Sequence, residues 1–574
     1  MYTTAEKPQK NKSKRRKTTV FRIIPVSPLE KIFAADKDCS PKGYSSFSML
    51  KGERSSFQVA VWQGRDDESV RGTTYYDATI RIDSEIAEMC NTFTVEDSPC
   101  DLPAYPDHDG DVISDKPGLY PDILMPVTPE ETRFSVLPER WRVFWIELDV
   151  PADAKAGAYE VRVSLMNGEE TLCETSVKVK IVDAVLPEQT LKYINWFHCD
   201  CIAEYYHVPV FSERHWELLG KYMAAAARHG MNTLLTPIFT PPLDTEIGGE
   251  RPTVQLVDVT VDSGRYSFGF EKFERYIRLA LESGMKYFEI SHMFTQWGAR
   301  NAPKIMATVD GEYKRVFGFE TDAAGEEYTA FLRAFAAAFI SELGRLGISD
   351  DCYFHVSDEP SPDHLEQYGK AAAIAHELFD GFKFIDALSS VDFYDSGLVR
   401  IPVPSTNHIQ PFLERDIDER WCYYCCGQYL KTSNRFLAMP SRRNRIIGLQ
   451  MYKYGMSGFL QWGYNFWFSR QSRGLIDPFR VTDGGGAWPS GDPFVVYPGA
   501  DGEPLVSLRF KVFYDALEDM RACQLLETLI GRGKVIALID EGLDEPLRFD
   551  NGPRCDCWLL DKREKINELI EQNR

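Results

Sequence analysis

Apolar and polar residues alternate along much of the first third of the chain. Segments 159–165 and 177–181 carry an apolar residue at every second position, which is the period of a strand with one buried face. Between them, Asn167-Gly168 is a strong hairpin signal, because a type I′ turn needs two residues that tolerate positive φ. Helical periodicity is nearly absent from this part of the chain. The pattern predicts an N-terminal β-sandwich domain over residues 20–190.

The pattern changes at about residue 191. Short apolar segments now alternate with amphipathic stretches of helix length, such as 212–229, which is typical of βα repeats. Eight segments are predicted to be strands: 193–200, 233–238, 287–294, 352–358, 382–388, 401–407, 421–426 and 458–466. Eight strand–helix units over roughly 300 residues predict a (β/α)8 TIM-type barrel over residues 191–506.

The two ends of the chain differ from these regions. Residues 1–19 are rich in lysine and arginine and are expected to form a disordered basic arm. The roughly 7–15 apolar residues of a secretory signal do not follow the arm, so we expect a cytoplasmic location. No run of about 18 apolar residues predicts a membrane span. Residues 507–574 begin with a helical pattern and are expected to form a short helical C-terminal region, giving a multidomain α/β protein.

Composition narrows the choice of partners. The formal net charge is −21, and a nucleic-acid backbone needs a basic face, so we expect no nucleic-acid partner. Aromatic residues make up 13% of the chain, which suits a sugar-binding cleft and a large core equally well. No glycine-rich nucleotide loop is present, and we expect no cofactor and no metal. The oligomeric state stays open.

Two groups of residues are predicted to be structural. The chain has 13 cysteines, and an odd number fits reduced thiols better than a disulfide framework. Cys422 and Cys425 have the spacing of half a zinc site, but no second pair lies at a suitable distance, so we expect them to pack in the core. Arg442, Arg443 and Arg445 are expected to form a solvated basic face.

The segment that ends at Pro360 carries the most informative chemistry. A strand-like apolar run starting at Cys352 ends in two adjacent carboxylates, Asp358 and Glu359. In a barrel of this type, catalytic residues lie at the carboxyl ends of the strands. The same tripeptide at 544–546 follows a polar turn, so the tripeptide alone does not indicate a catalytic pair. The strand-like run before Asp358 and Glu359 is what indicates one.

The other strand ends supply candidate substrate contacts. Aromatic faces stack on sugar rings, and a few polar groups fix the orientation of a ligand. The candidates for substrate binding are His198, His292, Trp297, Tyr394, Asn407, Tyr424, Trp462, Tyr464 and Trp467. Because alternate residues of a strand share a face, Trp462 and Tyr464 are expected to look into the same barrel mouth. His198 or His292 could tune the acid pair.

Two carboxylates among many aromatic residues indicate a glycoside hydrolase. An ordinary retaining enzyme holds its acid and its nucleophile on separate strands, but segment 421–427 offers no acid. A 2-acetamido sugar can instead attack with its own carbonyl oxygen and form an oxazoline. Asp358 would then stabilise the acetamido group, and Glu359 would act as general acid and then general base. A non-catalytic carbohydrate-binding barrel and a glycosidase for another sugar remain alternatives.

Four motifs carry a resemblance to a known family. They are Gly52-Glu53-Arg-Ser-Ser-Phe57-Gln58-Val59, His355-Val-Ser-Asp358-Glu359-Pro360, Tyr454-Gly455-Met-Ser-Gly458-Phe-Leu-Gln-Trp462-Gly-Tyr-Asn-Phe-Trp467, and Ser507-Leu-Arg509 with Leu517-Glu518-Asp519. Over most of residues 45–530, the chain resembles glycoside hydrolase family 123 and its relatives among the domain-of-unknown-function 4091 proteins. The resemblance implies a retaining β-N-acetylgalactosaminidase that uses substrate assistance, with these roles for Asp358 and Glu359.

Overall fold

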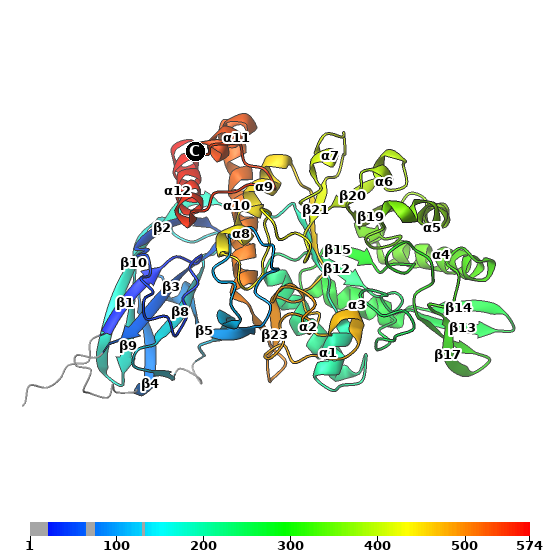
Figure 1. The fold of residues 1–574 in the computed structure, drawn as a ribbon, viewed down its shortest axis with the longest axis horizontal. Helices are drawn as coiled ribbons and strands as arrows, with labels where there is room; N and C mark the ends of the chain where they lie inside the picture. The colour runs from blue at the N-terminus through cyan, green and yellow to red at the C-terminus, as the bar shows by residue number, and fades with distance from the viewer. Residues whose placement is uncertain (1–20, 65–74, 129–132) are drawn as a thin grey trace, which may run out of the picture.

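Two five-stranded sheets make up the N-terminal region (Figure 1). A computed structural model describes residues 21–64, 75–128 and 133–574, and the arm predicted at 1–19 lies outside the described residues. One sheet has the order β1-β3-β8-β5-β6 and the other the order β2-β10-β9-β4-β7. The strands are β1 Phe21–Val26, β2 Ser46–Lys51, β3 Arg54–Gln63, β4 Tyr75–Asp83, β5 Cys90–Cys100, β6 Gly118–Pro126, β7 Phe134–Val136, β8 Trp141–Asp149, β9 Gly157–Asn167 and β10 Glu170–Val185.

One cluster of buried side chains draws on both sheets. Phe57 and Phe144 come from the first sheet and Val163 from the second, and all three are fully buried. β9 and β10 pair as an antiparallel hairpin, and Gly168 in its turn has a φ of +59°. The hairpin predicted from the Asn-Gly pair is therefore confirmed.

Eight strands, all paired in parallel, form the second large sheet, in the order β20-β19-β18-β15-β12-β11-β22-β21. They are β11 Lys192–Asn195, β12 Thr233–Thr236, β15 Tyr287–Ile290, β18 Cys352–Phe354, β19 Lys383–Leu388, β20 Ile401–Pro404, β21 Trp421–Tyr423 and β22 Gly458–Gln461. Each of the eight predicted segments overlaps one of these strands. Most of the strands end earlier than expected, because the chain leaves the sheet before its polar residues; β11, for example, ends at Asn195 rather than at residue 200.

The two outer strands of this sheet also meet each other. Ser405, which follows β20, forms an isolated parallel bridge with Tyr423 at the end of β21. The backbone N–H of Thr406 donates to Tyr423 O at 2.9 Å. A separate cluster of buried side chains collects residues from both outer strands and from strands between them, among them Val403 of β20 and Trp421 of β21.

Helices follow most strands of the parallel sheet. They are α1 Cys199–Tyr205, α2 Glu213–Arg228, α3 Glu271–Glu282, α4 Glu326–Leu346, α5 Leu365–Leu378, α6 Asp392–Asp395, α7 Gln410–Leu413, α8 Ser441–Arg445 and α9 Ile447–Tyr454. α2 starts after Ser212, whose side chain accepts a hydrogen bond from His215 N. α4 buries a stripe formed by Phe331, Phe335 and Phe339, whose spacing of four residues places them on one face.

Two smaller sheets are not evident in the sequence pattern. The four-stranded sheet β14-β13-β16-β17 packs beside α4, at the edge of the molecule away from the N-terminal region (Figure 1). Its strands are β13 Asp258–Asp262, β14 Arg265–Gly269, β16 Ile305–Val309 and β17 Glu312–Phe317, and the second small sheet pairs β23 Val496–Pro498 with β24 Pro504–Val506. These strands are short and lie in long connections or after the last strand of the parallel sheet, where local pattern is a weak guide.

Three C-terminal helices complete the molecule. They are α10 Leu508–Ile530, α11 Arg532–Asp540 and α12 Asp556–Gln572. α10 runs between the N-terminal sheets and the parallel sheet, and α12 covers β2 and β10 (Figure 1). Gly448 of α9 lies so close to α10 that a Cβ atom there would come within 1.9 Å of Ala516 O. Within the described ranges, no helix combines the length and the apolar character that crossing a membrane requires.

A buried ion pair joins the N-terminal sheets to α10. Asp122 of β6 accepts hydrogen bonds from Arg509 of α10, from Nε at 2.8 Å and from Nη2 at 2.9 Å. Tyr497 also donates to this carboxylate, at 2.6 Å. Arg509 is 2% exposed and Asp122 is 0% exposed, so each charge depends on the other for its stabilisation.

A second ionic cluster brings together two of the motifs that carry the family resemblance. Glu53 of the N-terminal region pairs with Arg563 of α12 at 2.7 Å, and Arg563 also pairs with Asp519 of α10 at 2.8 Å. Arg445 donates to the same Asp519 at 2.7 Å. These motifs therefore hold the regions of the chain together and lie away from the acid pair.

The prediction of a solvated basic face at Arg442, Arg443 and Arg445 is wrong, since all three side chains are buried. Arg442 pairs with Asp111, and Arg443 pairs with Asp109 at 3.1 Å. Both carboxylates come from the connection between β5 and β6. The three arginines look solvated in the sequence because their partners are distant there: those of Arg442 and Arg443 lie more than 300 residues away, and Asp519, which Arg445 binds, lies 74 residues away.

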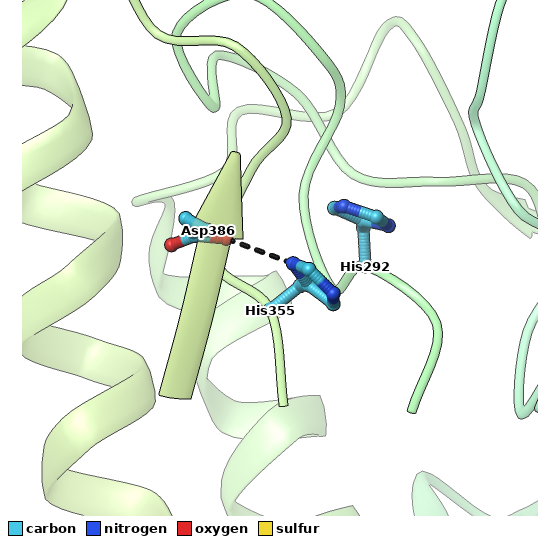
Figure 2. Close-up of side chains that lie close together, drawn as sticks. All are labelled: His292, His355 and Asp386. Carbon is cyan, nitrogen blue, oxygen red and sulfur yellow. Dashed lines mark hydrogen bonds and ion pairs between the residues drawn. The ribbon is translucent and has the colours of Figure 1, made fainter. Parts of the chain in front are cut away.

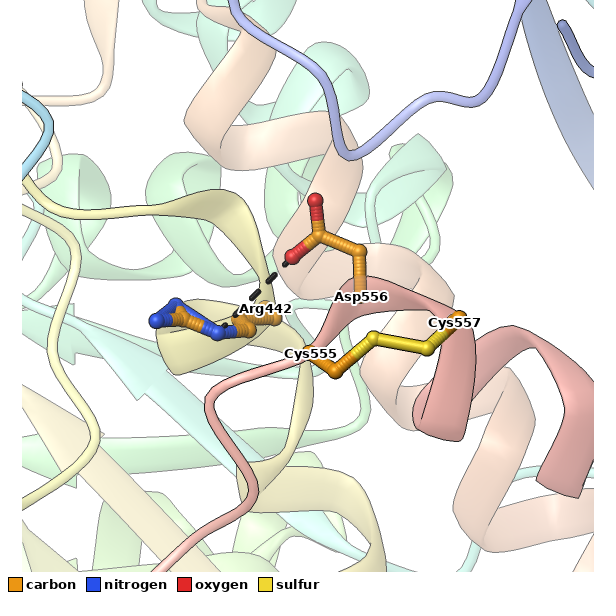
Figure 3. Close-up of a disulfide and its surroundings, with 4 residues drawn as sticks. All are labelled: Arg442, Cys555, Asp556 and Cys557. Atoms are coloured by element: carbon orange, nitrogen blue, oxygen red, sulfur yellow. Dashed lines mark ion pairs between the residues drawn. A yellow bond between two sulfur atoms is a disulfide. The ribbon is translucent and has the colours of Figure 1, made fainter. Parts of the chain in front are cut away.

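One pair of cysteines departs from the expected reduced thiols. Cys555 and Cys557 form a disulfide at the start of α12, and Asp556 between them forms an ion pair with Arg442 at 3.8 Å (Figure 3). The other eleven cysteines are free thiols. The disulfide therefore lies at the junction that α12 makes with the rest of the molecule.

Replacing Arg509 by methionine tests the buried junction. Removing one partner of a buried pair costs about 3–5 kcal/mol, so we expect Arg509→Met to unfold at a clearly lower urea concentration than wild type. The matched control is Arg333→Met at the exposed pair with Glu377, which should change the unfolding free energy by less than about 1 kcal/mol. Equal effects of the two variants would show that the Asp122 pair does not support the junction.

Candidate active site

A cavity of about 130 Å³ opens at the carboxyl ends of the parallel strands. Its lining residues are Trp196, His198, Leu243, Asp244, Gln296, Trp297, Asp358, Glu359, Ala387, Tyr423, Cys425, Cys426, Leu460, Trp462, Phe466 and Trp488. Five of the residues predicted for the site are among them: His198, Trp297, Asp358, Glu359 and Trp462. The two carboxylates thus share one cavity with a largely aromatic wall.

The backbone after β18 explains how two neighbouring carboxylates reach one cavity. Trp297 N donates to Asp358 O at 3.0 Å on one side, and Glu359 N donates to Ala387 O at 3.1 Å on the other. Glu359 has a φ of +44°, a left-handed conformation that costs a residue with a side chain about 1–3 kcal/mol. The chain is no longer a strand at this point, so strand alternation does not separate the two side chains, and both line the cavity. β18 has already ended at Phe354.

Asp358 is the more buried member of the pair, with 5% of its surface exposed. Gln296 Nε2 donates to its Oδ2 at 2.6 Å, and Gln296 Oε1 accepts from the backbone N–H of Asp244, which fixes the orientation of the amide. Burial, and then the nearby charge of Glu359, raise the pKa of Asp358 well above its usual value. This carboxyl group therefore holds its proton more strongly than a solvated aspartate does.

Glu359 is partly exposed to the cavity. Tyr423 OH donates to its Oε1 at 2.7 Å, and the Sγ atom of Cys425 lies 3.9 Å from the same oxygen. Both neighbours belong to β21 and the turn that follows it. The two carboxylates are therefore held from different sides of the cavity. Asp358 contacts the connection after β15, and Glu359 contacts the end of β21 and the turn after it.

Buried polar groups hold the aromatic wall in place. The indole N–H of Trp462 donates to Asp492 at 3.0 Å, and its ring lies 4.9 Å from that of Trp488 in an edge-on arrangement. Trp196 donates to Glu289 at 2.8 Å. Trp297 is 43% exposed, so its ring forms the rim of the cavity. Rings held in this way offer rigid surfaces for stacking on a sugar.

His198 lines the cavity in a neutral state. Arg251 donates to its Nδ1 at 3.2 Å, and its Nε2 donates to Trp462 O at 3.0 Å. Burial, and then the charge of Arg251, lower the pKa of His198 to about 3. His198 therefore supplies no positive charge to the acid pair, which differs from the tuning role considered above.

The charge beneath the pair belongs to His355. Its Nε2 contacts Glu289 and its Nδ1 contacts Asp386 at 3.1 Å, with all three side chains buried (Figure 2 shows His355 and Asp386). Burial lowers the pKa of His355, but the two carboxylates outweigh it and raise the pKa to about 10. Tyr368 donates to Asp386 as well. The result is an imidazolium fixed between two carboxylates.

His292 lies behind this network and does not line the cavity. Its ring stacks on His355, with 4.2 Å between centroids and an interplanar angle of 24° (Figure 2). Burial, and then the charge of His355, lower its pKa well below the usual value. His292, His355 and Asp386 have donor atoms close enough together to be considered for a metal. However, the two rings are nearly parallel, so their nitrogen lone pairs do not converge on one point. Both nitrogens of His355 also have carboxylate partners already. The geometry therefore favours a protonated His355 over a metal site.

Two further predicted contacts lie in connections outside the cavity. Tyr394 lies in α6, where its hydroxyl donates to Asp416 O at 3.0 Å. Asn407 is exposed and accepts a hydrogen bond from Gln428 at 2.9 Å. Neither is among the residues that line the cavity.

Three predicted aromatic contacts are core residues instead. The ring of Tyr424 packs on Phe459, Tyr464 donates to Tyr222 O at 2.9 Å, and Trp467 packs on the Tyr222 ring. The prediction that Trp462 and Tyr464 share a face is wrong, because β22 ends at Gln461 and strand alternation ends with it.

The sequence prediction missed several cavity residues. Tyr423 rather than Tyr424 reaches the cavity, which a correct strand register would indicate. Gln296 immediately precedes the predicted Trp297, so the same connection could suggest it. Cys425 is predicted above to pack in the core, but it lines the cavity together with Cys426, for which the sequence analysis makes no prediction.

Comparison with known proteins agrees with this geometry. The sequence profile of the glycoside hydrolase 123 catalytic domain matches residues 196–526. The chain belongs to glycoside hydrolase family 123. It is therefore a glycoside hydrolase that acts on carbohydrate, as its acid pair and aromatic wall indicate. No curated protein matches the sequence.

One solved structure has the same overall fold as this family 123 enzyme, and two others are less similar. A family 123 glycoside hydrolase from Clostridium perfringens, whose structure concerns glycolipid glycan hydrolysis, matches with a TM-score of 0.72 and 15% identity, over 96% of this chain and 98% of that one. A family 39 glycoside hydrolase from Bacteroides cellulosilyticus WH2 gives a TM-score of 0.32 and 10% identity, over 75% and 77% of the two chains. A Bacteroides ovatus xyloglucanase gives 0.25 and 10%, over 83% and 98%.

The charge on His355 can be measured directly. We expect its ring nitrogens to show imidazolium ¹⁵N shifts at pH 7.5 and to titrate near pH 10, while His198 stays neutral. Because the folded pKa lies above the unfolded value of about 6.5, the protonated ring stabilises the fold fully below that pH. This stabilisation is lost as the pH rises through about 10. His355→Gln assigns the signal, and a neutral His355 at pH 7.5 would contradict the network.

Proposed function

We propose that this family 123 enzyme is a retaining hydrolase of 2-acetamido-2-deoxy-β-hexosides of the β-N-acetylgalactosaminidase type. The substrate's own acetamido oxygen is the nucleophile. One observation carries the proposal: Asp358 and Glu359, consecutive in the chain, both line one aromatic cavity and have different partners there. An ordinary retaining enzyme takes its acid and its nucleophile from separate strands, whereas these two carboxylates come from one strand end.

In this mechanism Glu359 protonates the glycosidic oxygen as the bond to the anomeric carbon breaks. The carbonyl oxygen of the acetamido group attacks that carbon from the opposite face and closes an oxazolinium ring. Glu359 then takes a proton from water, which opens the ring and restores the original anomeric configuration. The hydrogen bond from Tyr423 orients Glu359 for both proton transfers.

Asp358 accepts the acetamido N–H and stabilises the positive charge that develops on the ring. To do so it must be ionised, which burial and Glu359 oppose. Gln296 donates to the carboxylate, and the imidazolium of His355 adds a favourable charge, so both favour the ionised form. The two acids then share one proton. Binding of the substrate amide, and later the positive charge of the oxazolinium, favours ionised Asp358, so this proton resides on Glu359.

Asp244 is the third carboxyl group of the cavity, and we assign it to binding a sugar hydroxyl group. Its Oδ2 accepts from Gln471 N at 2.8 Å, and its backbone holds the amide of Gln296. Burial raises its pKa. These contacts fix the orientation of the Asp244 side chain, which suits binding of a hydroxyl group better than nucleophilic attack.

We also propose that the parallel sheet is a closed (β/α)8 barrel and that the N-terminal sheets form a sandwich. Contact between β20 and β21 at Ser405 and Tyr423 supports the barrel, as does the inner cluster that both strands share. The apolar cluster shared by the two five-stranded sheets supports the sandwich. In such a barrel the acid pair lies at the face where catalytic residues gather.

Exchanging each acid for its amide tests the two roles. With 4-nitrophenyl 2-acetamido-2-deoxy-β-galactoside, we expect Glu359→Gln and Asp358→Asn each to lower kcat by roughly 10²-fold or more. The same Asp-Glu-Pro tripeptide at 544–546 is exposed on the surface, so Asp544→Asn and Glu545→Gln are matched controls that should keep full activity. A fully active Asp358→Asn variant would remove substrate assistance even if hydrolysis is real.

The nucleophile can be tested on the substrate itself. Replacing the acetyl group by mono-, di- and trifluoroacetyl weakens the carbonyl oxygen as a nucleophile, so we expect kcat/KM to fall stepwise along the series. A 2-hydroxy substrate should not be turned over. Equal rates along the series, with brisk hydrolysis of the 2-hydroxy sugar, would indicate a protein nucleophile and a different sugar specificity.

A further inference from the structure

The connection between β5 and β6 carries the N-terminal region onto the rim of the cavity. Asp107 accepts from Tyr429 OH at 2.7 Å, and Asp109 accepts from Lys431 N at 2.6 Å. Both partners lie in the connection after β21, the one that supplies Cys425 to the cavity. Two segments more than 300 residues apart therefore form one continuous surface beside the active site.

Buried ion pairs hold this connection in place. Arg443 pairs with Asp109 at 3.1 Å, and both side chains are 7% exposed. Arg442 pairs with Asp111, and Ile113 N donates to Ala438 O at 2.8 Å. A connection anchored at several points keeps its shape when a ligand arrives, so it can serve as part of a binding site.

Tyr105 is the residue of this connection that approaches the cavity. Its hydroxyl lies beside the thiol of Cys426, which lines the cavity, and burial and this thiol raise its pKa. Its ring stands edge-on to that of Tyr429, with 4.9 Å between centroids. Both tyrosines are only half-buried.

The order of the two acids sets the direction of a glycan across the cavity. Asp358 is bonded from the side of Gln296, whereas Glu359 is bonded from the side of Tyr423 and lies 3.9 Å from Cys425. The group that protonates the leaving oxygen lies between the sugar ring and the aglycone. The aglycone must therefore leave over the edge formed by Cys425 and Cys426.

We infer that Tyr105, together with Tyr429, forms the subsite for the aglycone sugar, so that the N-terminal region helps to select the substrate. The inference rests on the proposed function, because it takes the acid from that mechanism. The ligand class is a hexose joined through its hydroxyl group to the 2-acetamido sugar. An open aromatic edge and the nearby Asp107 carboxylate offer such a ring a stacking surface and a hydrogen-bond acceptor.

Two substrates that differ only in the aglycone test this subsite. One is the β-linked disaccharide of the 2-acetamido sugar and galactose, and the other is the 2-acetamido glycosyl fluoride, which has no aglycone sugar. We expect Tyr105→Ala to lower kcat/KM for the disaccharide about tenfold, the effect of losing one aromatic contact, and to change the fluoride reaction less than about twofold. Unchanged turnover of the fluoride also shows that the variant folds.

Two control variants, and the results that would contradict the inference, complete this test. Tyr105→Phe keeps the ring and should retain most of the disaccharide activity, and Tyr313→Ala, at an exposed tyrosine of β17, should alter neither reaction. Equal losses on both substrates, or no loss on either, would overturn the subsite while leaving the proposed function intact. A wild-type enzyme that hydrolyses neither substrate would refute the proposed function and the subsite together.

Discussion

The backbone bend at Glu359 is the constraint on which the site depends. A strand would direct Asp358 and Glu359 to opposite faces, and only one of them could reach the cavity. A φ of +44°, held by backbone hydrogen bonds to Trp297 and Ala387, lets both line it. The bonds come from the connection after β15 on one side and from β19 on the other, and together they hold this strained conformation in place.

Electrostatics give the two acids different environments. Asp358 is buried, bonded by Gln296 and close to an imidazolium, whereas Glu359 is partly open and bonded by a phenol. His355 can remain charged only because Glu289 and Asp386 both contact it in a buried setting. Burial and the charge of Glu359 raise the pKa of Asp358 and the charge of His355 opposes this rise, so the two neighbouring acids differ in their electrostatic environment.

The strands and several helices could be predicted from apolar periodicity, because burial imposes that period on the sequence. Each of the eight predicted segments overlaps a strand of the parallel sheet. The acid pair could also be predicted, since two carboxylates after a buried strand are chemically conspicuous. Prediction failed just beyond the strand ends, where alternation stops: Tyr423 takes the place expected for Tyr424, and Tyr464 and Trp467 turn into the core.

Long-range partners could not be predicted from local pattern at all. Three arginines close together in the sequence suggested a solvated face, yet Arg442 and Arg443 bind carboxylates of the β5–β6 connection. For the same reason, the sequence does not reveal that Tyr105 lies beside Cys426. These contacts depend on how the N-terminal sheets dock, which the buried pair between Arg509 and Asp122 fixes from the other side of the junction.

The most direct test is a crystal structure with a thiazoline derived from the 2-acetamido sugar, a stable mimic of the oxazoline. The geometry at the cavity predicts the fused ring against Trp462, with its nitrogen about 2.7–3.2 Å from the Asp358 carboxylate and Glu359 beside the anomeric carbon. A thiazoline whose nitrogen meets a different group, or one bound away from both acids, would contradict the assignment of the pair.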